Sequence, residues 1–195
     1  MKIQKVAIFC GSSIGMDEVY AQAAKHTGEL FAERGIDLIY GGGGIGLMGV
    51  VANTMMEKGA HVTGVIPKFL ATKEIANNEI TELIVVDTMH ERKAIMSQMS
   101  DAVLVLPGGI GTLEEFFEVF TWGQLGLHQK PIAILNVKGF FDPLIELIDH
   151  MRSQGFLRSE HFDMLLVSDS LEEILSRMET YAPPPLPKWF NESEI

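Results

Sequence analysis

Cysteine is nearly absent from this chain of 195 residues: Cys10 stands alone, which excludes an intrachain disulfide framework and fits a reducing compartment. Long apolar runs are also missing, since none approaches the roughly 20 residues that a membrane-spanning helix needs. Basic side chains are scarce, with 15 Lys and Arg against 26 Asp and Glu, and the net charge of -11 argues against a nucleic-acid partner. We therefore expect a cytoplasmic protein with neither a nucleic-acid nor a membrane partner.

The chain does contain a regular alternation of short apolar runs and longer helical patterns. Apolar residues make up 47% of the sequence, enough for one folded domain with a full core. The expected strands are 5–10, 37–40, 61–66, 83–86, 102–106, 132–136 and 165–167. The expected helices are 17–34, 47–58, 89–100, 112–125, 141–154 and 171–179. This alternation predicts an α/β fold, a single-domain, Rossmann-like, doubly wound parallel sheet with helices on both faces.

The domain boundary is expected near residue 180. Residues 182–187 read Ala-Pro-Pro-Pro-Leu-Pro, which breaks the helical pattern and favours an extended segment. We therefore place the α/β domain at residues 1–180 and a proline-rich tail at residues 181–195. In doubly wound sheets, ligands bind beyond the carboxyl ends of the strands at a switch point, so the loops after the strands are the candidate sites.

The most informative loop reads Pro-Gly-Gly-Ile-Gly-Thr-Leu-Glu-Glu over residues 107–115. It follows an apolar strand pattern and opens an apolar-periodic helix. Such a turn leaves bare backbone N–H groups at a helix N-terminus, where an anion is favoured. It also places carboxylates in the first helical turn beside that anion. A phosphate cradle next to an acid points to chemistry on a phosphorylated small molecule.

A second glycine-rich loop covers residues 40–49, Tyr-Gly-Gly-Gly-Gly-Ile-Gly-Leu-Met-Gly. It matches the dinucleotide pattern GxGxxG, but it follows the second strand, and no acid ends the next strand to hold a ribose. No Lys-Ser or Lys-Thr pair follows, so it is not a Walker loop either. We expect Gly42, Gly43 and Gly44 to contact a ligand through the backbone, the alternative being a tight turn with close helix–strand packing.

The acids and cations near these loops each have two interpretations. Thr112 and Glu115 have the spacing of a capping box, which would explain Glu115 without any catalytic role. Glu114 and Glu115 are adjacent on a helix, so they point about 100° apart and cannot face one atom. Arg92 and Lys93 stand near the positive end of a helix, an unfavourable place for cations. They are either a solvated pair or compensated by a substrate anion.

Other reactive residue types suggest no metal or cofactor. None of the six histidines has metal-ligand spacing, and no pyridoxal-phosphate site is recognisable. We expect Cys10 to be buried as a small apolar residue. The apolar positions of helix 112–125 cover more than one face, which fits either burial in the sheet sandwich or a homodimer interface beside the site. We expect a homodimer with neither metal nor cofactor.

Three motifs, in this order and spacing, resemble the LONELY GUY family of cytokinin riboside 5'-monophosphate phosphoribohydrolases. They are Tyr-Gly-Gly-Gly-x-x-Gly-Leu-Met-Gly, Met-His-x-Arg-Lys-Ala and Pro-Gly-Gly-x-Gly-Thr-x-x-Glu. The similarity runs from about residue 6 to about residue 178. Family members are often labelled lysine decarboxylases, a label that this sequence does not support.

The resemblance implies hydrolysis of the N-glycosidic bond of a nucleoside 5'-monophosphate, with release of the base and ribose 5-phosphate. It implies catalytic importance for Arg92 and Glu115. It implies substrate contact for Glu74, Lys93, Gly108, Gly109, Gly111, Thr112, Glu114 and Thr121. Cytokinin nucleotides, AMP and other purine monophosphates all fit the sequence.

Three other functions are compatible with a glycine-loop α/β domain. A non-catalytic nucleotide carrier or sensor would need the glycine loops but no particular acid at position 115. A dinucleotide-dependent redox enzyme is disfavoured by the missing acid at the strand end. A nucleotide transferase would use the same acid and the same phosphate-binding loop.

Overall fold

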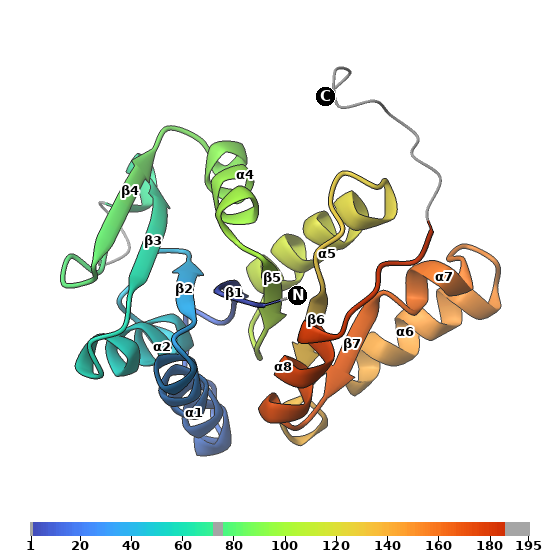
Figure 1. The fold of residues 1–195 in the computed structure, drawn as a ribbon, viewed down its shortest axis with the longest axis horizontal. Helices are drawn as coiled ribbons and strands as arrows, with labels where there is room; N and C mark the ends of the chain where they lie inside the picture. The colour runs from blue at the N-terminus through green and yellow to red at the C-terminus, as the bar shows by residue number, and fades with distance from the viewer. Residues whose placement is uncertain (1, 72–75, 186–195) are drawn as a thin grey trace.

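A computed structural model describes residues 2–71 and 76–185. Seven strands form one parallel sheet in the order β4-β3-β2-β1-β5-β6-β7 (Figure 1). The strands are β1 (Lys5–Phe9), β2 (Asp37–Tyr40), β3 (Val62–Pro67), β4 (Glu82–Val86), β5 (Ala102–Val105), β6 (Ile132–Leu135) and β7 (Leu165–Ser168). The predicted fold class is confirmed, and every predicted strand end lies within one residue of the observed one.

The helices cover both faces of the sheet. They are α1 (Glu18–Arg34), α2 (Gly46–Glu57), α3 (Lys68–Ala71), α4 (Met89–Met99), α5 (Ile110–Gln124), α6 (Asp142–Ser153), α7 (Ser159–Phe162) and α8 (Leu171–Glu179), with a 3-10 turn η1 (Val137–Gly139). Figure 1 shows α1, α2 and α8 on one side of the sheet and α4 and α5 on the other. The six predicted helices are all present, whereas the one-turn elements α3, η1 and α7 were not predicted.

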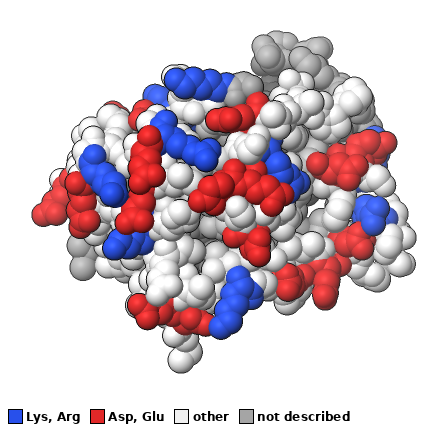
Figure 2. Space-filling view, turned by 60° about the horizontal axis from the view of Figure 1, so that its bottom comes forward, with Lys and Arg blue, Asp and Glu red and all other residues white. Residues whose placement is uncertain are grey.

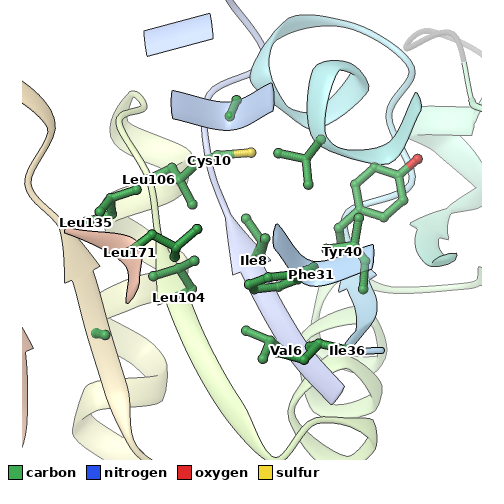
Figure 3. Close-up of a cluster of buried hydrophobic side chains, with 14 of the residues drawn as sticks. Val6, Ile8, Cys10, Phe31, Ile36, Tyr40, Leu104, Leu106, Leu135 and Leu171 are labelled. Atoms are coloured by element: carbon green, nitrogen blue, oxygen red, sulfur yellow. The ribbon is translucent and has the colours of Figure 1, made fainter. Parts of the chain in front are cut away.

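The two apolar layers follow from alternation along the strands. Successive side chains of a strand point to opposite faces, and both faces here are covered. Val6 and Ile8 of β1 pack with α1 and α2 in one cluster, whereas Ala7 and Phe9 pack with α4 and α5 in the other. Figure 3 shows the first cluster, in which β1 lies between side chains of β5 and of β2. The continuous apolar runs of the sequence therefore predicted correctly that both faces of the strands are buried.

The strand order reverses between β1 and β5, which is the switch point of the sheet. The two loops that leave this point are bonded to each other: Gly11 N–H donates to the Pro107 carbonyl at 3.0 Å. Leu106 N–H similarly donates to the Phe9 carbonyl at 2.9 Å. The loop after β1 and the Pro-Gly-Gly loop after β5 are thus held side by side, and α5 begins directly above them.

The surface carries the acidic excess of the sequence. On the face shown in Figure 2, lysines and arginines are interspersed with acidic side chains rather than gathered into a basic patch. Across residues 2–71 and 76–185, no helix combines the length and apolarity required to cross a bilayer. Residues 181–185 of the predicted tail form neither helix nor strand, and 186–195 lie outside the described residues. The domain boundary near residue 180 stays a prediction.

Candidate active site

Helix α5 begins two residues earlier than the sequence indicated. Its N-cap is Gly109, which has no side chain to cap with, and Ile110 is the first helical residue. Thr112 is therefore inside the first turn and buried, so the predicted capping box of Thr112 and Glu115 is wrong. The N–H groups of residues 110–112 have no acceptor within the helix, as in the first turn of any helix. Such a helix end favours an anion, and Glu115 needs another explanation than capping.

A cavity of about 240 Å³ lies at this helix end. Its walls come from the ends of β1 and β5, the start of α2, helix α4 and the first turns of α5. They comprise Cys10, Ser12, Met48, Arg92, Gly109, Ile110, Gly111, Thr112 and Glu115. The cavity thus combines free backbone donors, two hydroxyls, a guanidinium and a carboxyl group. The cavity lies at the edge of the sheet that the sequence predicted, and Ser12 and Met48 are part of its lining.

Arg92 is buried at the bottom of this site. Its Nε donates to the Val65 carbonyl at 3.1 Å, and its Nη2 donates to the Gly41 carbonyl at 3.4 Å. Its Nη1 lies 3.4 Å from Glu115 Oε1, and 9% of the side chain is exposed. The solvated alternative for Arg92 is therefore wrong. Three of its five N–H groups are directed at protein acceptors, which fixes the plane of the guanidinium.

Gly41 permits this arrangement because a Cβ at that position would collide with Arg92 Nη2. The glycine-rich loop after β2 therefore has a packing reason at its first residue. Gly46, in the left-handed region with φ of 64°, similarly has no room for a Cβ against the backbone of Ser12. These two positions match the alternative of close packing that the sequence left open.

Glu115 is the most perturbed acid of the site. Its side chain is 11% exposed and forms an ion pair with Arg92. Burial raises its pKa from the ordinary 4.5 to about 7, and the nearby Arg92 guanidinium offsets part of that rise. A carboxyl group with such a pKa exchanges protons near neutral pH, as general acids and bases do.

Lys93, the next residue on α4, pairs with two other carboxylates. Its Nζ lies 2.5 Å from Glu114 Oε1 and 2.9 Å from Glu118 Oε2, and only 8% of its side chain is exposed. Burial lowers the pKa of Lys93, but the two carboxylate partners more than compensate and leave that pKa raised. Glu114 and Glu115 therefore face different cations, in line with the expected angle of about 100° between them.

The remaining predicted residues occupy several places. Gly108 and Gly109 lie in the loop at the cavity, and a Cβ at Gly108 would collide with Thr112 Oγ1. Gly42 and Gly43 make backbone contacts to the segment after α3: the Gly42 carbonyl accepts from Asn77 N–H at 3.0 Å, and Gly43 forms a bridge with Ala76.

Three further predicted positions lie away from the Arg92 cavity or cannot be placed. Gly44 lines a separate polar cavity of about 320 Å³ together with Asn77. Thr121 is exposed and its hydroxyl donates to the Phe117 carbonyl at 2.7 Å. Glu74 lies outside the described residues.

A second cavity, of about 270 Å³, adjoins the first across Ser12 and Gly109. Tyr20 and Phe140 form one wall, with their ring centroids 5.5 Å apart in an edge-on arrangement. Among the described residues, those that line it carry no charge. The molecule thus offers a polar, charged cavity and an apolar, uncharged one on either side of the glycine loop.

Neither the cysteine nor the metal-ligating residue types offer a second chemistry among the described residues. Cys10 is buried, as expected, and burial together with the neighbouring Glu115 raises its pKa, which disfavours a thiolate. Within the described part of the chain, no three histidines, cysteines or acids gather as a metal site would require.

Glu118 and the capping box of α4 were not predicted from the sequence. Glu118 follows Glu114 by four residues, which places both on one helix face, and this spacing was a usable signal. The capping box belongs to α4, where Thr88 Oγ1 accepts from Glu91 N–H at 3.1 Å and Thr88 N–H donates to Glu91 Oε2. It fixes the start of the helix that carries Arg92 and Lys93.

Fold and site together define an α/β protein in which a helix N-terminus with free N–H groups lies next to a buried arginine–glutamate pair. Residues 48–178 match the family model described as possible lysine decarboxylase. The chain is 44% identical over 182 residues to the protein of Oryza sativa subsp. japonica named cytokinin riboside 5'-monophosphate phosphoribohydrolase LOG, covering 93% of this chain and 75% of that one. The relative LOG2 of Arabidopsis thaliana is also 44% identical, and the match covers 93% of this chain and 85% of that protein. The chain therefore belongs to the LONELY GUY family.

Solved structures of low sequence identity share the fold. The molybdenum cofactor carrier protein of Chlamydomonas reinhardtii superposes with a TM-score of 0.68 at 17% identity, covering 92% of this chain and 98% of that one. The molybdenum cofactor binding protein of Rippkaea orientalis gives a TM-score of 0.68 at 18% identity, and the match covers 92% of this chain and 98% of that one. At this identity the likeness concerns the fold alone.

Proposed function

We propose that the protein hydrolyses the N-glycosidic bond of a nucleoside 5'-monophosphate and releases the free base and ribose 5-phosphate. The observation that carries this proposal is Glu115: a buried carboxyl group with a pKa of about 7, held beside Arg92, in the cavity where the first N–H groups of α5 are free. The printed names of relatives 44% identical to the chain support the same reaction.

Glu115 is assigned the chemical step. Cleavage of the bond between C1' and the base nitrogen develops positive charge on the ribose, which an adjacent carboxylate stabilises. The same carboxylate orients a water molecule, whose oxygen bonds to C1' while its proton passes to the carboxylate and then to the departing base. Both roles need the ionised form of Glu115, which predominates above about pH 7.

Arg92 and the helix end are assigned the remaining roles. Because Arg92 is anchored to the Val65 and Gly41 carbonyls, we infer that it orients Glu115 rather than moving to follow the substrate. The substrate phosphate then takes the free N–H groups of residues 110–112, with Thr112 Oγ1 in reach. Phosphate bound there is a remote handle that holds the ribose against Glu115.

The other predicted contacts are proposed as follows. Glu74, Glu114, Thr121 and the backbone of Gly42–Gly44 remain proposed contacts to the ribose or base. Lys93 is a proposed contact to the phosphate side of the substrate, although its charge is already matched by two carboxylates in this structure. The base itself stays open among cytokinin and other purine bases.

The first experiment is base release from a panel of nucleoside 5'-monophosphates, measured by chromatography, with the nucleosides lacking phosphate as controls. Release from monophosphates only, and its loss in Glu115→Gln, is the expected result. Tight binding of monophosphates without release of base from any of them would overturn the proposal and favour a carrier or sensor.

We also propose a homodimer that works in the cytoplasm. Ile110 is 83% exposed at the start of α5, and Leu113 and Phe117 follow on the same helix face, partly buried. This stripe favours a second copy of the chain as its cover. Light scattering after gel filtration should give about 43 kDa, twice the 21.6 kDa of one chain; a mass of one chain at micromolar concentration would refute the dimer.

A further inference from the structure

The cluster around Lys93 joins helices α4 and α5 next to the proposed catalytic pair. The ammonium of Lys93 comes from α4, and Glu114 and Glu118 approach it from successive turns of α5 at 2.5 and 2.9 Å. Arg92 and Glu115 are their immediate neighbours on the same two helices and lie 3.4 Å apart. The two ion-pair groups therefore fix the same helix–helix contact at two adjacent points.

Glu118 is the more buried partner of Lys93. Its side chain is 22% exposed, against 52% for Glu114, so its bond to Lys93 is better shielded from solvent. Two glutamates four residues apart on a helix repel each other unless a cation lies between them. Lys93 provides that cation, and a buried ammonium in turn needs a carboxylate partner. Each member of the cluster thus requires the others to stay where they are.

The charges facing Glu115 explain why this cluster bears on the reaction. Arg92 and Lys93 face it from α4 and lower its pKa; Glu114 and Glu118 face it from α5 and raise its pKa. Cys10, at the end of β1, is also close enough for its own pKa to be affected by Glu115. Without the charge of Glu118, Glu115 would face one acid fewer while both cations stayed in place, and it would titrate at lower pH.

We propose that Glu118 is a positioning residue of the active site, which anchors Lys93 to α5, balances its charge together with Glu114, and thereby holds α4 where Arg92 meets Glu115. The proposal rests on the function proposed above, because it assigns Glu118 a part in presenting Glu115 to the substrate. Glu118 acts through Lys93 and touches no reacting atom.

The test compares three variants with a matched control. Glu118→Gln keeps an oxygen acceptor for Lys93 but removes the charge, and Glu118→Ala removes both. Lys93→Met leaves the two carboxylates beside Glu115 without their cation. Glu146→Gln removes an exposed carboxylate on α6 and serves as the control. The readouts are the pH dependence of kcat/KM and a carbon-13 NMR titration of the Glu115 carboxyl group, assigned by its disappearance in Glu115→Gln.

We expect the titration midpoint of Glu115 to shift in opposite directions when the charge of Glu118 and the charge of Lys93 are removed. Glu118→Gln should move the Glu115 midpoint to lower pH, Lys93→Met should move it to higher pH, and Glu146→Gln should leave it unchanged. Glu118→Ala should lower kcat by about tenfold or more while KM changes by less than about threefold, because misplacement of the catalytic pair affects the chemical step.

Three results would overturn the positioning role. They are a wild-type Glu115 midpoint in Glu118→Gln, shifts of the same sign in Glu118→Gln and Lys93→Met, and a Glu118→Ala enzyme with unchanged kcat. The NMR titration needs no substrate, so it decides the matter even if the wild-type protein releases no base. In that case the proposed function fails while the role of Glu118 in setting the titration of Glu115 is judged separately.

Discussion

Replacing Glu115 by glutamine is expected to make the protein inactive and more stable at the same time. The ionised carboxylate is held in a buried site, which raises its pKa from 4.5 to about 7. Each unit of pKa is worth about 1.36 kcal/mol, so ionised Glu115 costs the folded state at most about 3.4 kcal/mol. This cost is already net of the attraction to Arg92, and we expect Glu115→Gln to stabilise the fold by about 1–3 kcal/mol at pH 8.

The sign of the pH dependence follows from linkage. A carboxyl group whose pKa is higher in the folded state keeps its proton longer there, so the folded chain binds more protons than the unfolded chain between pH 4.5 and about 7. The cost of Glu115 is therefore full above about pH 7 and fades as the pH falls towards 4.5. The advantage of the glutamine variant should shrink to below about 1 kcal/mol at pH 5.

The assay is urea unfolding of wild-type and Glu115→Gln protein at pH 8 and pH 5, with thermal melts in parallel. A gain of 1–3 kcal/mol corresponds to a rise in Tm of roughly 3–10 °C for a chain of this size. Base release at pH 8 should fall by at least about 100-fold in the same variant. A variant that is less stable than wild type at pH 8, or equally affected at both pH values, would refute the account of a strained, ionised carboxylate.

Three other perturbations test neighbouring parts of the site. For the wild-type enzyme, kcat/KM should fall about tenfold per pH unit below about pH 7 and level off above it, and a flat profile from pH 5 to 8 would contradict ionised Glu115 as the active form. Gly41→Ala should displace the Arg92 guanidinium and reduce kcat by about 10- to 100-fold with the fold intact by circular dichroism; unchanged kcat would mean that Arg92 need not be held there. Gly108→Ala, which crowds Thr112, should raise KM for the monophosphate by about tenfold or more, and an unaltered KM would place the phosphate elsewhere.

Much of the fold could be predicted because its signals are local. Continuous apolar runs indicated strands covered on both faces, and the spacing of helical patterns indicated crossovers in a parallel sheet. The one-turn helices α3 and α7 are too short for any periodic signal, which explains why they were missed. A cavity lies at the carboxyl edge of β1 and β5, where the switch point of the sheet led us to expect the candidate site.

The details of the site depend on contacts that spacing alone does not encode. Local capping rules favoured Thr112 as the N-cap, but the Pro-Gly-Gly turn starts α5 earlier and leaves Thr112 buried in its first turn. Arg92 and Lys93 suggested solvated charges, because the carbonyls and carboxylates that bury them are distant in sequence. Glu115 could be named from the motif, but its raised pKa follows from burial, which only the packed structure reveals.

The anchoring of Arg92 has a consequence for how the protein becomes active during folding. Its guanidinium contacts the Gly41 carbonyl just after β2 and the Val65 carbonyl within β3, whereas Glu115 follows β5, on the other side of the central strand. Neither half of the chain therefore contains the pair, and it assembles only after the longest-range parallel pairing, that of β1 with β5, has formed. Recovery of activity during refolding should thus lag behind recovery of helical signal, and two fragments divided between α4 and β5 should regain activity only on association.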